Sequence, residues 1–536
     1  MRRLIPISGF ILLTLAGFSL LRADDRAYTG ALNADDPTFS SSFNLDRDES
    51  VYIEAASISG DLDTYLSLQN AAGVIVAAND NRDYNQLNSA LGYTAPKAGA
   101  YTITLSRTAD ASSGDYELNI VIGDASVLDS LDSQPAEMTL SGPALTLDTA
   151  HFRIHYTLQG ADAVKKDYVY QVAKTMEDVW HRQVIEMKWP APPTDGHNGG
   201  DARMDIYLID TLDGDGYGAM GSARHGNQYG DNPHTAAVEH YASSTLLRLD
   251  NDFAELASDD DAINLLRTTA AHEFHHAIQH GYDINDFGWY AESTSVWMET
   301  QTFPKNQDAT GYVAYNYRYP ELCFGTESDP DEGMMRYGEW LFIQSLVDAH
   351  GQKVIHKLWS DIARYEGFDA LDHTLAFVDD SIPNALARYR IQNIVRDYKF
   401  APDFNGATLW LSNNIGGVGR IDGYGVQELG ANYIAFNPPK GTYRVTLIDD
   451  GSLELWAVGI KGNEASAIAL GQGGIISNRG YDHVYLMVFN PALPDNLADC
   501  NYANYNLDVS PANAALTPVT QTWDAKYFLP LKSESD

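Results

Sequence analysis

The stretch AINLLRTTAAHEFHHAIQHG, residues 262–281, decides the fold of the central part of the chain. It contains no proline, and its only glycine is the last residue. At about 3.6 residues per turn, its apolar side chains share one helical face. These residues are Ile263, Leu266, Ala270, Phe274 and Ala277. The stretch therefore predicts a helix from about Ala262 to His280 that ends at Gly281.

Two histidines of this helix are spaced for metal binding. His272 and His276 lie four residues apart, so both imidazoles point from one helix face and can reach one metal ion. Glu273 is turned by one residue, so it can reach a water molecule beside the metal rather than the metal. The pattern His-Glu-x-x-His is typical of a catalytic zinc site. The alternative is a histidine-rich surface helix without metal, which the extra residues His275 and His280 would fit.

A catalytic zinc ion needs a third protein ligand and an open position for water. One common pattern requires glycine at position 279 and histidine at position 282, but the chain has Gln279 and Tyr282, which excludes it. The other common solution is a glutamate on a following helix. Glu292 lies 292 − 272 = 20 residues after His272, which is enough for a turn and an antiparallel return. Glu299, two helical turns further along, is the rival third ligand.

Three segments carry a resemblance to a known class of enzymes. Residues 271–282, 289–299 and 336–342 resemble the exported gluzincin zinc metallopeptidases of bacteria. The resemblance covers about residues 147–400 and implies an α+β zincin-like domain. It also implies one catalytic Zn²⁺ and a protein or peptide substrate. In such enzymes zinc polarises the peptide carbonyl, and a glutamate moves a proton from water to the leaving amine.

The resemblance also assigns roles to single residues. It implies that His272, His276 and Glu292 bind the metal and that Glu273 is the general base. A tyrosine or histidine usually stabilises the oxyanion, and Tyr337 is the candidate here. The alternative for Tyr337 is an ordinary buried core residue. Many gluzincins carry an aspartate four residues after the ligand glutamate, but this chain has valine there, so the group that orients the histidine is unassigned.

Residues 24–124 predict a small β-sandwich, because short β-rich runs alternate with Gly, Asn and Asp turns. The order of the motifs at 60–66, 78–81, 98–103 and 113–116 resembles the bacterial pre-peptidase C-terminal (PPC) domain. That domain accompanies many secreted peptidases, so the resemblance implies an accessory role rather than a catalytic one.

The rest of the chain predicts a multidomain protein. Residues 125–146 are rich in Ser, Asp, Pro and Gly and predict a linker. Residues 147–405 predict the α+β metallopeptidase domain, in which 244–249 is either the edge strand that pairs with substrate or an interior strand. Residues 406–536 return to β-rich runs and predict a second β-sandwich. We therefore expect a zincin-like domain flanked by N- and C-terminal all-β sandwich domains.

The N-terminus predicts export. Arg2 and Arg3 precede an almost wholly apolar run from Leu4 to Leu21, and acidic residues follow directly. We interpret residues 1–23 as a signal peptide, which predicts a secreted or periplasmic protein without membrane contact after cleavage. An uncleaved membrane anchor is the alternative.

The charge balance excludes one class of partner. The 536 residues include 73 acidic and 35 basic side chains, which gives a formal net charge of −38. A surface this acidic repels phosphate backbones, so we expect no nucleic-acid partner. Some acidic residues could hold Ca²⁺, either at 210–216 or at Asp61, Asp63 and Asp80, but 210–216 lacks the spacing of a calcium-binding loop, and tight turns are the favoured interpretation there.

Two questions stay open at the level of sequence. Cys323 and Cys500, the only cysteines, either form a disulfide or remain two buried thiols. The predicted function is a secreted zinc metallopeptidase, and the alternative is an extracellular adhesion or ligand-binding protein with a structural or inactive zinc site. The presence of Glu273 favours the enzyme, because a structural site needs no base.

Overall fold

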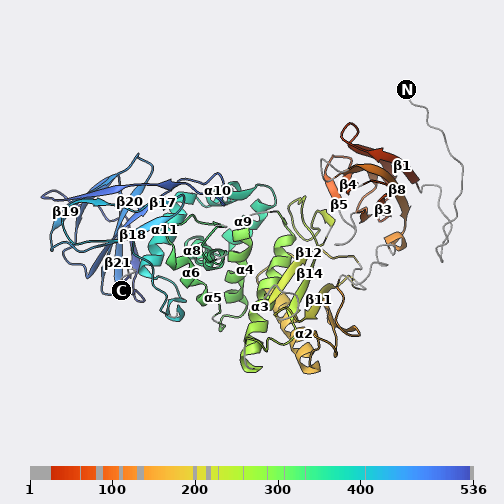
Figure 1. Ribbon diagram of the computed structural model, residues 1–536, viewed down its shortest axis with the longest axis horizontal. Coiled ribbons are helices and arrows are strands. Elements are labelled where there is room, and N and C mark those ends of the chain that lie inside the picture. The colour runs from red at the N-terminus through yellow and green to blue at the C-terminus, as the bar shows by residue number, and fades with distance from the viewer. Residues whose placement is uncertain are drawn as a thin grey trace. The chain divides into compact units, whose positions relative to one another are not determined.

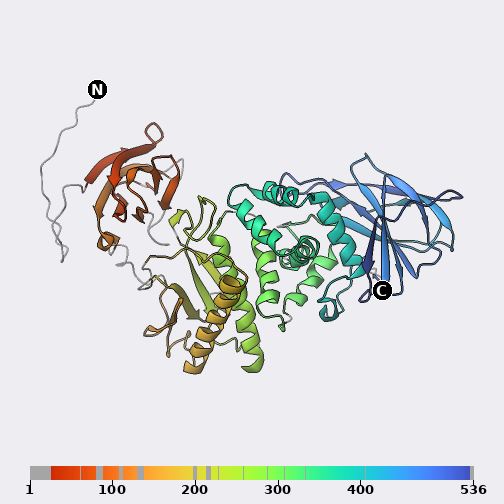
Figure 2. The ribbon, with the colours of Figure 1, turned by 180° about the vertical axis from the view of Figure 1, so that it is seen from behind.

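The structure is a computed structural model that describes residues 26–531, except 61, 80–87, 108–112, 129–137, 197–198, 200–201, 213–218, 227, 257–258, 286–287, 307, 327, 332 and 405. The predicted signal peptide, residues 1–23, lies outside the described residues. The chain forms two compact units, drawn in red to orange and in amber to blue in Figures 1 and 2. The described residues before Met138 make up most of the first unit. Those of Met138–Gly196, Asp201–Gly226 and Gly230–Asp536 make up the second.

The first unit is a β-sandwich, as the sequence predicted. Its elements are β1 (Arg26–Leu32), β2 (Thr38–Leu45), β3 (Ser50–Ser57), β4 (Thr64–Asn70), β5 (Ile75–Asn79), β6 (Ser89–Thr94), β7 (Gly99–Arg107), β8 (Gly114–Gly123) and the short helix η1 (Ala125–Leu128). One antiparallel sheet has the order β1-β8-β3-β6, and the other contains the neighbours β5-β4-β7-β2. Alternate side chains such as Ile53, Leu66, Ile103 and Leu118 are fully buried and form the core of the unit.

The second unit begins with an α/β part. Its elements are β9 (Leu145–Asp148), β10 (Phe152–Tyr156), α2 (Lys166–Trp180), the π-helix η2 (His181–Glu186), β11 (Met204–Ile209), β12 (Gly221–His225), β14 (Thr245–Asp250) and α3 (Asp259–His280). Five of these strands form a sheet with the order β12-β14-β11-β10-β9. Strands β10, β11 and β14 are parallel, and β9 and β12 run antiparallel to them. Helices α2 and α3 lie beside this sheet in Figures 1 and 2.

Residues 244–249 form an interior strand, which is the second of the two alternatives that the sequence left open. Strand β14, which covers most of residues 244–249, lies between β12 and β11 inside the sheet. Within the described residues, the edge next to it is β12, whose five residues Gly-Ser-Ala-Arg-His give little strand signal. The strong apolar run of β14 is that of an interior strand, because both of its faces are covered.

A helical part follows α3. It consists of α4 (Gly288–Thr302), α5 (Asp308–Gly311), α6 (Val313–Arg318), α7 (Met335–Gly338), α8 (Trp340–His350), α9 (Lys353–Ile362), α10 (Gly367–Phe377), α11 (Ile382–Val395) and η4 (Ala401–Asp403). Helix α4 packs against α3 on one side and against α7 and α8 on another. None of the helices in the described part of the chain combines the length and the apolar character needed to cross a membrane.

The last part of the chain is a second β-sandwich, drawn in blue in Figure 1. Its strands are β15 (Asn413–Ile415), β16 (Gly419–Asp422), β17 (Val426–Gln427), β18 (Ala431–Phe436), β19 (Thr442–Ile448), β20 (Glu454–Lys461), β21 (Glu464–Gly471), β22 (Gly473–Ser477), β23 (His483–Phe489), β24 (Tyr502–Ala503), β25 (Asn506–Pro511) and β26 (Gln521–Asp524). The larger sheet has the order β15-β18-β23-β20-β21-β26, and the smaller has the order β16-β25-β19-β22. Strands β17 and β24 form a separate pair.

The larger of these sheets is buried on both faces. One face, which includes Ile434 and Leu486, packs inside the sandwich. The other face, which includes Tyr433 and Met487, belongs to the same hydrophobic core as the helices, and the Tyr433 hydroxyl donates to the backbone oxygen of Arg390 on α11. Apolar residues on both faces explain why β18 and β23 read as nearly continuous apolar runs.

The two cysteines form a disulfide. Cys323 and Cys500 are both buried, and their Cα atoms are 6.2 Å apart, within the usual range for a bridge. The bond joins the loop between α6 and α7 to the loop between β23 and β24. Of the two alternatives that the sequence left open, the paired one is therefore present.

Candidate metal centre

Helix α3 presents its two predicted ligand histidines away from the sheet. Its opposite face is fixed by Leu266, Ala270 and Phe274, which are fully buried. The Phe274 ring packs against the rings of Phe152 on β10 and Trp180 on α2 at centroid distances of 5.8 and 5.6 Å. Because this apolar face anchors the helix, the direction in which its other face points is set by the core.

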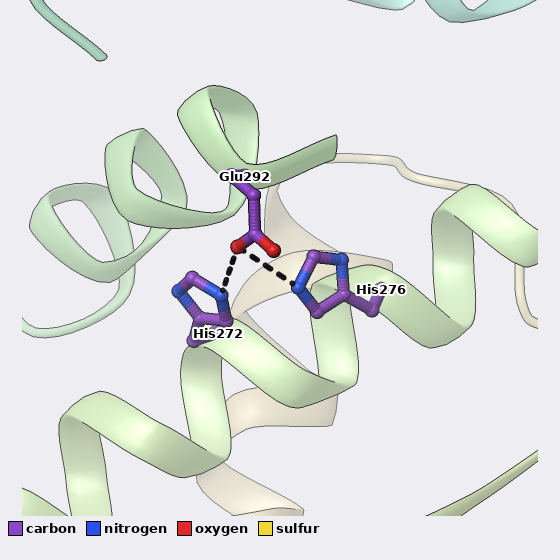
Figure 3. A group of neighbouring side chains, drawn as sticks. All are labelled: His272, His276 and Glu292. Atoms are coloured by element: carbon purple, nitrogen blue, oxygen red, sulfur yellow. Dashed lines mark hydrogen bonds and ion pairs between the residues drawn. The ribbon is translucent and has the colours of Figure 1, made fainter. Parts of the chain in front are cut away.

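The third predicted ligand approaches from the neighbouring helix. Glu292 lies one turn into α4, and Figure 3 shows its carboxylate above the two imidazole rings. Its Oε2 atom is 3.2 Å from His272 Nε2 and 3.6 Å from His276 Nε2. One donor atom from each residue lies within 4.8 Å of the other two. The structure thus brings together His272, His276 and Glu292, which the sequence placed on two separate helices.

The donor set suits zinc by chemistry and by spacing. Zn²⁺ binds imidazole nitrogen and carboxylate oxygen, and bond lengths of about 2.0–2.1 Å separate tetrahedral ligand atoms by roughly 3.3–3.4 Å. The observed separations of 3.2 and 3.6 Å lie on either side of this range. All three side chains retain some solvent exposure, between 11% and 20%. The three donors therefore fit a zinc ion with one position left for water or substrate.

Each histidine is oriented by an acceptor on the other side of its ring. His272 Nδ1 donates to Glu299 Oε1 at 2.7 Å, and His276 Nδ1 donates to Gln279 Oε1 at 2.7 Å. A proton on Nδ1 leaves Nε2 with a free electron pair directed at the centre of the site. Glu299, the rival ligand in the sequence, thus contacts the back of His272 and not the group of three donors.

Sequence reasoning did not identify Gln279 and Glu299 as orienting residues. Gln279 is held in turn, because its Nε2 donates to Thr294 Oγ1 at 2.7 Å and to the Ala291 backbone oxygen at 3.0 Å. The available signal was helical spacing. Gln279 is three residues after His276, and Glu299 is seven residues, or two turns, after Glu292.

The electrostatics of the site reflect its burial. Burial by itself lowers the pKa of His272, but the carboxylates of Glu292 and Glu299 raise the pKa well above its ordinary value. Burial by itself raises the pKa of Glu292. His272 and His276 outweigh burial and hold this pKa well below its usual range. Burial raises the pKa of Glu299 to about 7, although the bond from His272 lowers it. The site thus combines buried carboxylates and imidazoles that compensate one another.

Glu273 points toward the sheet edge rather than into the three-donor group. The side chain is buried, and its carboxylate accepts a hydrogen bond from the backbone N–H of Ala223 on β12. Burial raises its pKa, whereas the nearby His272 and His276 lower it. A β-carbon on Gly221, also in β12, would lie 3.1 Å from Glu273 Cγ. The absence of a side chain at Gly221 therefore lets the edge strand approach Glu273 closely.

Tyr337 lies in the same site. Its ring is nearly parallel to that of His272, with a centroid distance of 5.9 Å and an interplanar angle of 15°. Its hydroxyl lies near Glu292, and burial together with the negative charge of Glu292 raises its pKa. Tyr312, which the sequence analysis missed, packs its ring 5.2 Å from that of Tyr337. Both tyrosines are partly exposed.

The extra histidines of α3 do not join the three donors. His275 is fully buried, where its Nδ1 lies 3.2 Å from Gln183 Oε1 and burial lowers its pKa well below the ordinary value. His280 Nδ1 lies 2.8 Å from Thr245 Oγ1, and burial lowers the pKa of His280 to about 3. Both are neutral residues packed between the helix and its surroundings, so α3 is not simply a histidine-rich surface helix.

A second group of acidic side chains has a structural use. Asp250, Asp252 and Glu255 also bring carboxylate oxygens within 4.8 Å of one another. Asp250 Oδ1 accepts from the backbone N–H of Asp252 and of Phe253, and its Oδ2 accepts from Thr211. The turn after β14 thus accounts for the position of Asp250.

The predicted calcium sites fall mainly on residues that the structure does not describe. Asp61, Asp80 and residues 213–216 lie outside the described residues. Calcium binding therefore stays a prediction from sequence.

Two families match this sequence. Residues 159–454 match the family described as "Family of unknown function (DUF6055)", and residues 37–107 match the "Bacterial pre-peptidase C-terminal domain". The second match confirms the resemblance that the sequence motifs indicated for the first unit. The first match includes α3, α4 and α7 and continues past residue 405 into the second β-sandwich. No curated protein matches the chain.

Several solved structures are similar to parts of the chain. The pre-peptidase C-terminal domain of a collagenase from Bacillus anthracis is 19% identical, and the match covers 18% of this chain and 88% of that one with a TM-score of 0.16. The IMPa metallopeptidase from Pseudomonas aeruginosa is 11% identical over 67% of this chain and 45% of its own, with a TM-score of 0.21. The ZmpB metallopeptidase from Clostridium perfringens is 9% identical over 86% and 94%, with a TM-score of 0.25.

Proposed function

The chain belongs to the DUF6055 family of unknown function, and from this premise we propose that it is an exported zinc metallopeptidase that hydrolyses peptide bonds in proteins. One observation carries the proposal. Two imidazole nitrogens and one carboxylate oxygen converge, while both Nδ1 atoms are tied to acceptors behind the rings. Three protein donors and one open position are the arrangement of a catalytic zinc site, whereas a structural site has four protein donors.

Glu273 acts as the general base in this proposal. A zinc ion bound by His272, His276 and Glu292 would supply Lewis-acid chemistry for the hydrolysis of a peptide bond. Glu273 is adjacent to this group but is not one of the donors, so its carboxylate is available for proton transfer. It takes the proton that the attacking water loses and delivers it to the nitrogen of the leaving amine.

Tyr337 stabilises the negative charge that develops on the carbonyl oxygen. Its hydroxyl lies near Glu292, and its ring faces His272, so it lies directly beside the proposed reaction centre. A phenol O–H directed at the developing oxyanion lowers the energy of the transition state more than that of the bound substrate.

Strand β12 guides the substrate. It is hydrogen-bonded to β14 along one side and contacts Glu273 through Ala223. An extended peptide that pairs with this edge passes directly beside Glu273. The lack of a side chain at Gly221 supports this placement, because it keeps the strand close to α3.

Export is part of the proposal. The apolar segment within residues 1–23, the PPC match and the Cys323–Cys500 disulfide all suit a secreted or periplasmic protein. We propose a signal peptide at 1–23, the PPC domain at 24–124 and a linker at 125–146. The metallopeptidase domain then spans 147–405, and the C-terminal β-sandwich spans 406–536.

The proposal is tested on the purified protein by metal analysis and by casein hydrolysis with and without a chelator. We expect one zinc ion per chain and hydrolysis that stops when the chelator removes it. Glu273→Gln should keep zinc and lose at least about 100-fold in rate, whereas Glu186→Gln, on the exposed end of η2, should behave as the wild type. A wild-type protein without zinc would exclude the proposed function. Zinc with a ligand-binding activity that survives Glu273→Gln, and no cleavage, would favour the adhesion alternative.

A further inference from the structure

A short buried turn lies between the second β-sandwich and the metal centre. It consists of Cys323, Phe324 and Gly325, and we refer to it as the buttress turn. Cys323 and Phe324 are completely buried, and Gly325 adopts a φ of +81°, a backbone conformation that favours glycine. The turn belongs to the loop between α6 and α7, so its shape is set by contacts with other elements rather than by a helix or strand.

Three bonds anchor the buttress turn. The disulfide joins Cys323 to Cys500, and the backbone N–H of Cys323 donates to Gln427 Oε1 at 2.8 Å. The backbone N–H of Gly325 donates to Glu339 Oε1 at 2.8 Å inside the core. Two of these anchors come from the second β-sandwich, and the third comes from the residue that separates α7 from α8.

On its other side, the buttress turn packs against the helix that carries Glu292. The ring of Phe324 meets that of Trp289 edge to face, at a centroid distance of 4.7 Å. A β-carbon on Gly325 would lie 2.6 Å from Trp289 Cδ1, so the backbone of the turn touches the indole. Trp289 is one helical turn before Glu292 in α4, and its side chain is 1% exposed. A shift of the turn is therefore passed to the first turn of α4.

The buttress turn is also bonded to the segment that carries Tyr337. Glu339, the acceptor for Gly325, is two residues after Tyr337 and directly follows the short helix α7. Helix α7 has only four residues, so it depends on such contacts for its position. The buttress turn is thus bonded or packed to both segments that bring Glu292 and Tyr337 to the site.

We propose that Glu339 and the Cys323–Cys500 disulfide are positioning groups, which hold the buttress turn against Trp289 and thereby fix Glu292 for zinc binding and Tyr337 for catalysis. This inference rests on the proposed function. It assigns to the second β-sandwich a direct part in assembling the metal centre, because Cys500 and Gln427 both belong to it.

The sharpest test compares two glycines that have nearly the same positive φ. Gly325 has a φ of +81° and touches Trp289, whereas Gly351 has a φ of +80° and has nothing within 4 Å of a built β-carbon. Gly325→Ala and Gly351→Ala both place an alanine at a positive φ, but only the first pushes the indole. Zinc affinity is measured by competition with a chromophoric chelator. Circular dichroism checks that each variant is folded.

We expect Gly325→Ala to bind zinc at least about tenfold more weakly than the wild type, while Gly351→Ala stays within about twofold. If both folded variants bind zinc with the same affinity, the inference is overturned. If Gly325→Ala does not fold, a second pair decides. Glu339→Ala removes the acceptor for Gly325, whereas Glu339→Gln keeps an oxygen in the same place.

In that second pair, Glu339→Ala should weaken zinc binding and Glu339→Gln should restore it to near the wild-type value. The double variant Cys323→Ser/Cys500→Ser should also bind zinc more weakly, with a lower kcat and little change in KM. Normal zinc affinity in both Glu339→Ala and the double cysteine variant would overturn this inference but not the proposed function. A wild-type protein that binds no zinc would overturn the proposed function and this inference with it.

Discussion

His272 donates its Nδ1 proton to Glu299 at 2.7 Å, while its Nε2 lies 3.2 Å from Glu292 on the other side of the ring. The two glutamates come from the same helix, two turns apart, yet they contact opposite nitrogens of one imidazole. The Glu299 carboxylate fixes the tautomer of His272, whereas the Glu292 carboxylate lies beside Nε2, the nitrogen that would bind the metal.

Loss of the Glu299 acceptor should weaken metal binding without removing a ligand. We expect Glu299→Leu to lower zinc affinity by about 10–100-fold, because the His272 ring is then no longer held in one tautomer and orientation. Glu299→Gln retains an acceptor oxygen and should have a smaller effect. The two variants are compared by zinc competition. An unchanged affinity in Glu299→Leu would show that Glu299 does not orient His272.

Gln279 has the corresponding role for the second histidine. Gln279→Leu should also lower zinc affinity by about 10–100-fold, because His276 Nδ1 loses the acceptor at 2.7 Å. Gln301→Leu, at the end of α4 and away from the donors, is the matched control. Equal zinc affinities in the two variants would contradict the role of Gln279.

Tyr337→Phe should separate catalysis from metal binding. We expect kcat to fall by about 100–1000-fold, because the variant lacks the O–H that stabilises the oxyanion, while zinc content and KM stay near the wild-type values. Tyr312→Phe removes the hydroxyl of the neighbouring ring and should affect kcat much less. Steady-state kinetics on one peptide substrate compare the two. Equal losses of kcat would indicate that Tyr337 has no special part in the reaction.

Gly221→Ala should impair substrate use while leaving the metal in place. The added β-carbon would lie 2.6 Å from Thr269 Cγ2 and 3.1 Å from Glu273 Cγ, so either β12 or the side chains of Thr269 and Glu273 must shift. We expect kcat/KM to fall on the order of 10–100-fold, because Glu273 and the substrate strand are no longer aligned. Gly311→Ala, where nothing lies within 4 Å, is the control. Zinc content is measured in parallel and should not change.

Glu339 should make folding stability depend on pH. Burial raises its pKa to about 8, above the ordinary 4.5 that it regains on unfolding. The folded protein therefore keeps a proton that the unfolded chain releases, and the stabilising contribution is complete below pH 4.5 and is lost as the pH rises toward 8.

Between about pH 4.5 and pH 8, the titration of Glu339 alone lowers the free energy of unfolding by about 1.4 kcal/mol per pH unit. Glu339→Gln removes this titration. From pH 5 to pH 8, the urea midpoint of the wild type should therefore fall relative to that of the variant. A difference that does not depend on pH would contradict the raised pKa.

Local periodicity predicted much of the candidate site. The pair His272 and His276 follows from the spacing of one helix, and Glu292 follows from the length of chain needed for a second helix to return. Their meeting in space depends on how α3 and α4 pack, which the apolar face of α3 indicated but did not determine. The proximity of Tyr337 could not be derived from spacing, because 45 residues and two short helices separate it from Glu292 (337 − 292 = 45).

Other features depend on tertiary contacts and left little trace in the sequence. Strand β12 lacks a β-rich pattern because, at the sheet edge, its hydrogen bonds to β14 hold it in place. Gln279 was visible only as the residue that excluded another class of zinc site. The β-sandwiches were predictable as elements from their turns and alternation, but the burial of β18 and β23 on both faces was not.

The shared core of the helices and the six-stranded sheet changes what a break in the backbone would do. A single cut by a protease between η4 and β15 separates the chain into two polypeptides, yet the Tyr433–Arg390 contact and the disulfide both cross the cut. The product would be a two-chain protein that migrates as one species on a non-reducing gel and as two after reduction. The six-stranded sheet would still cover the helical half. Cleavage at this point would therefore not by itself release the C-terminal half.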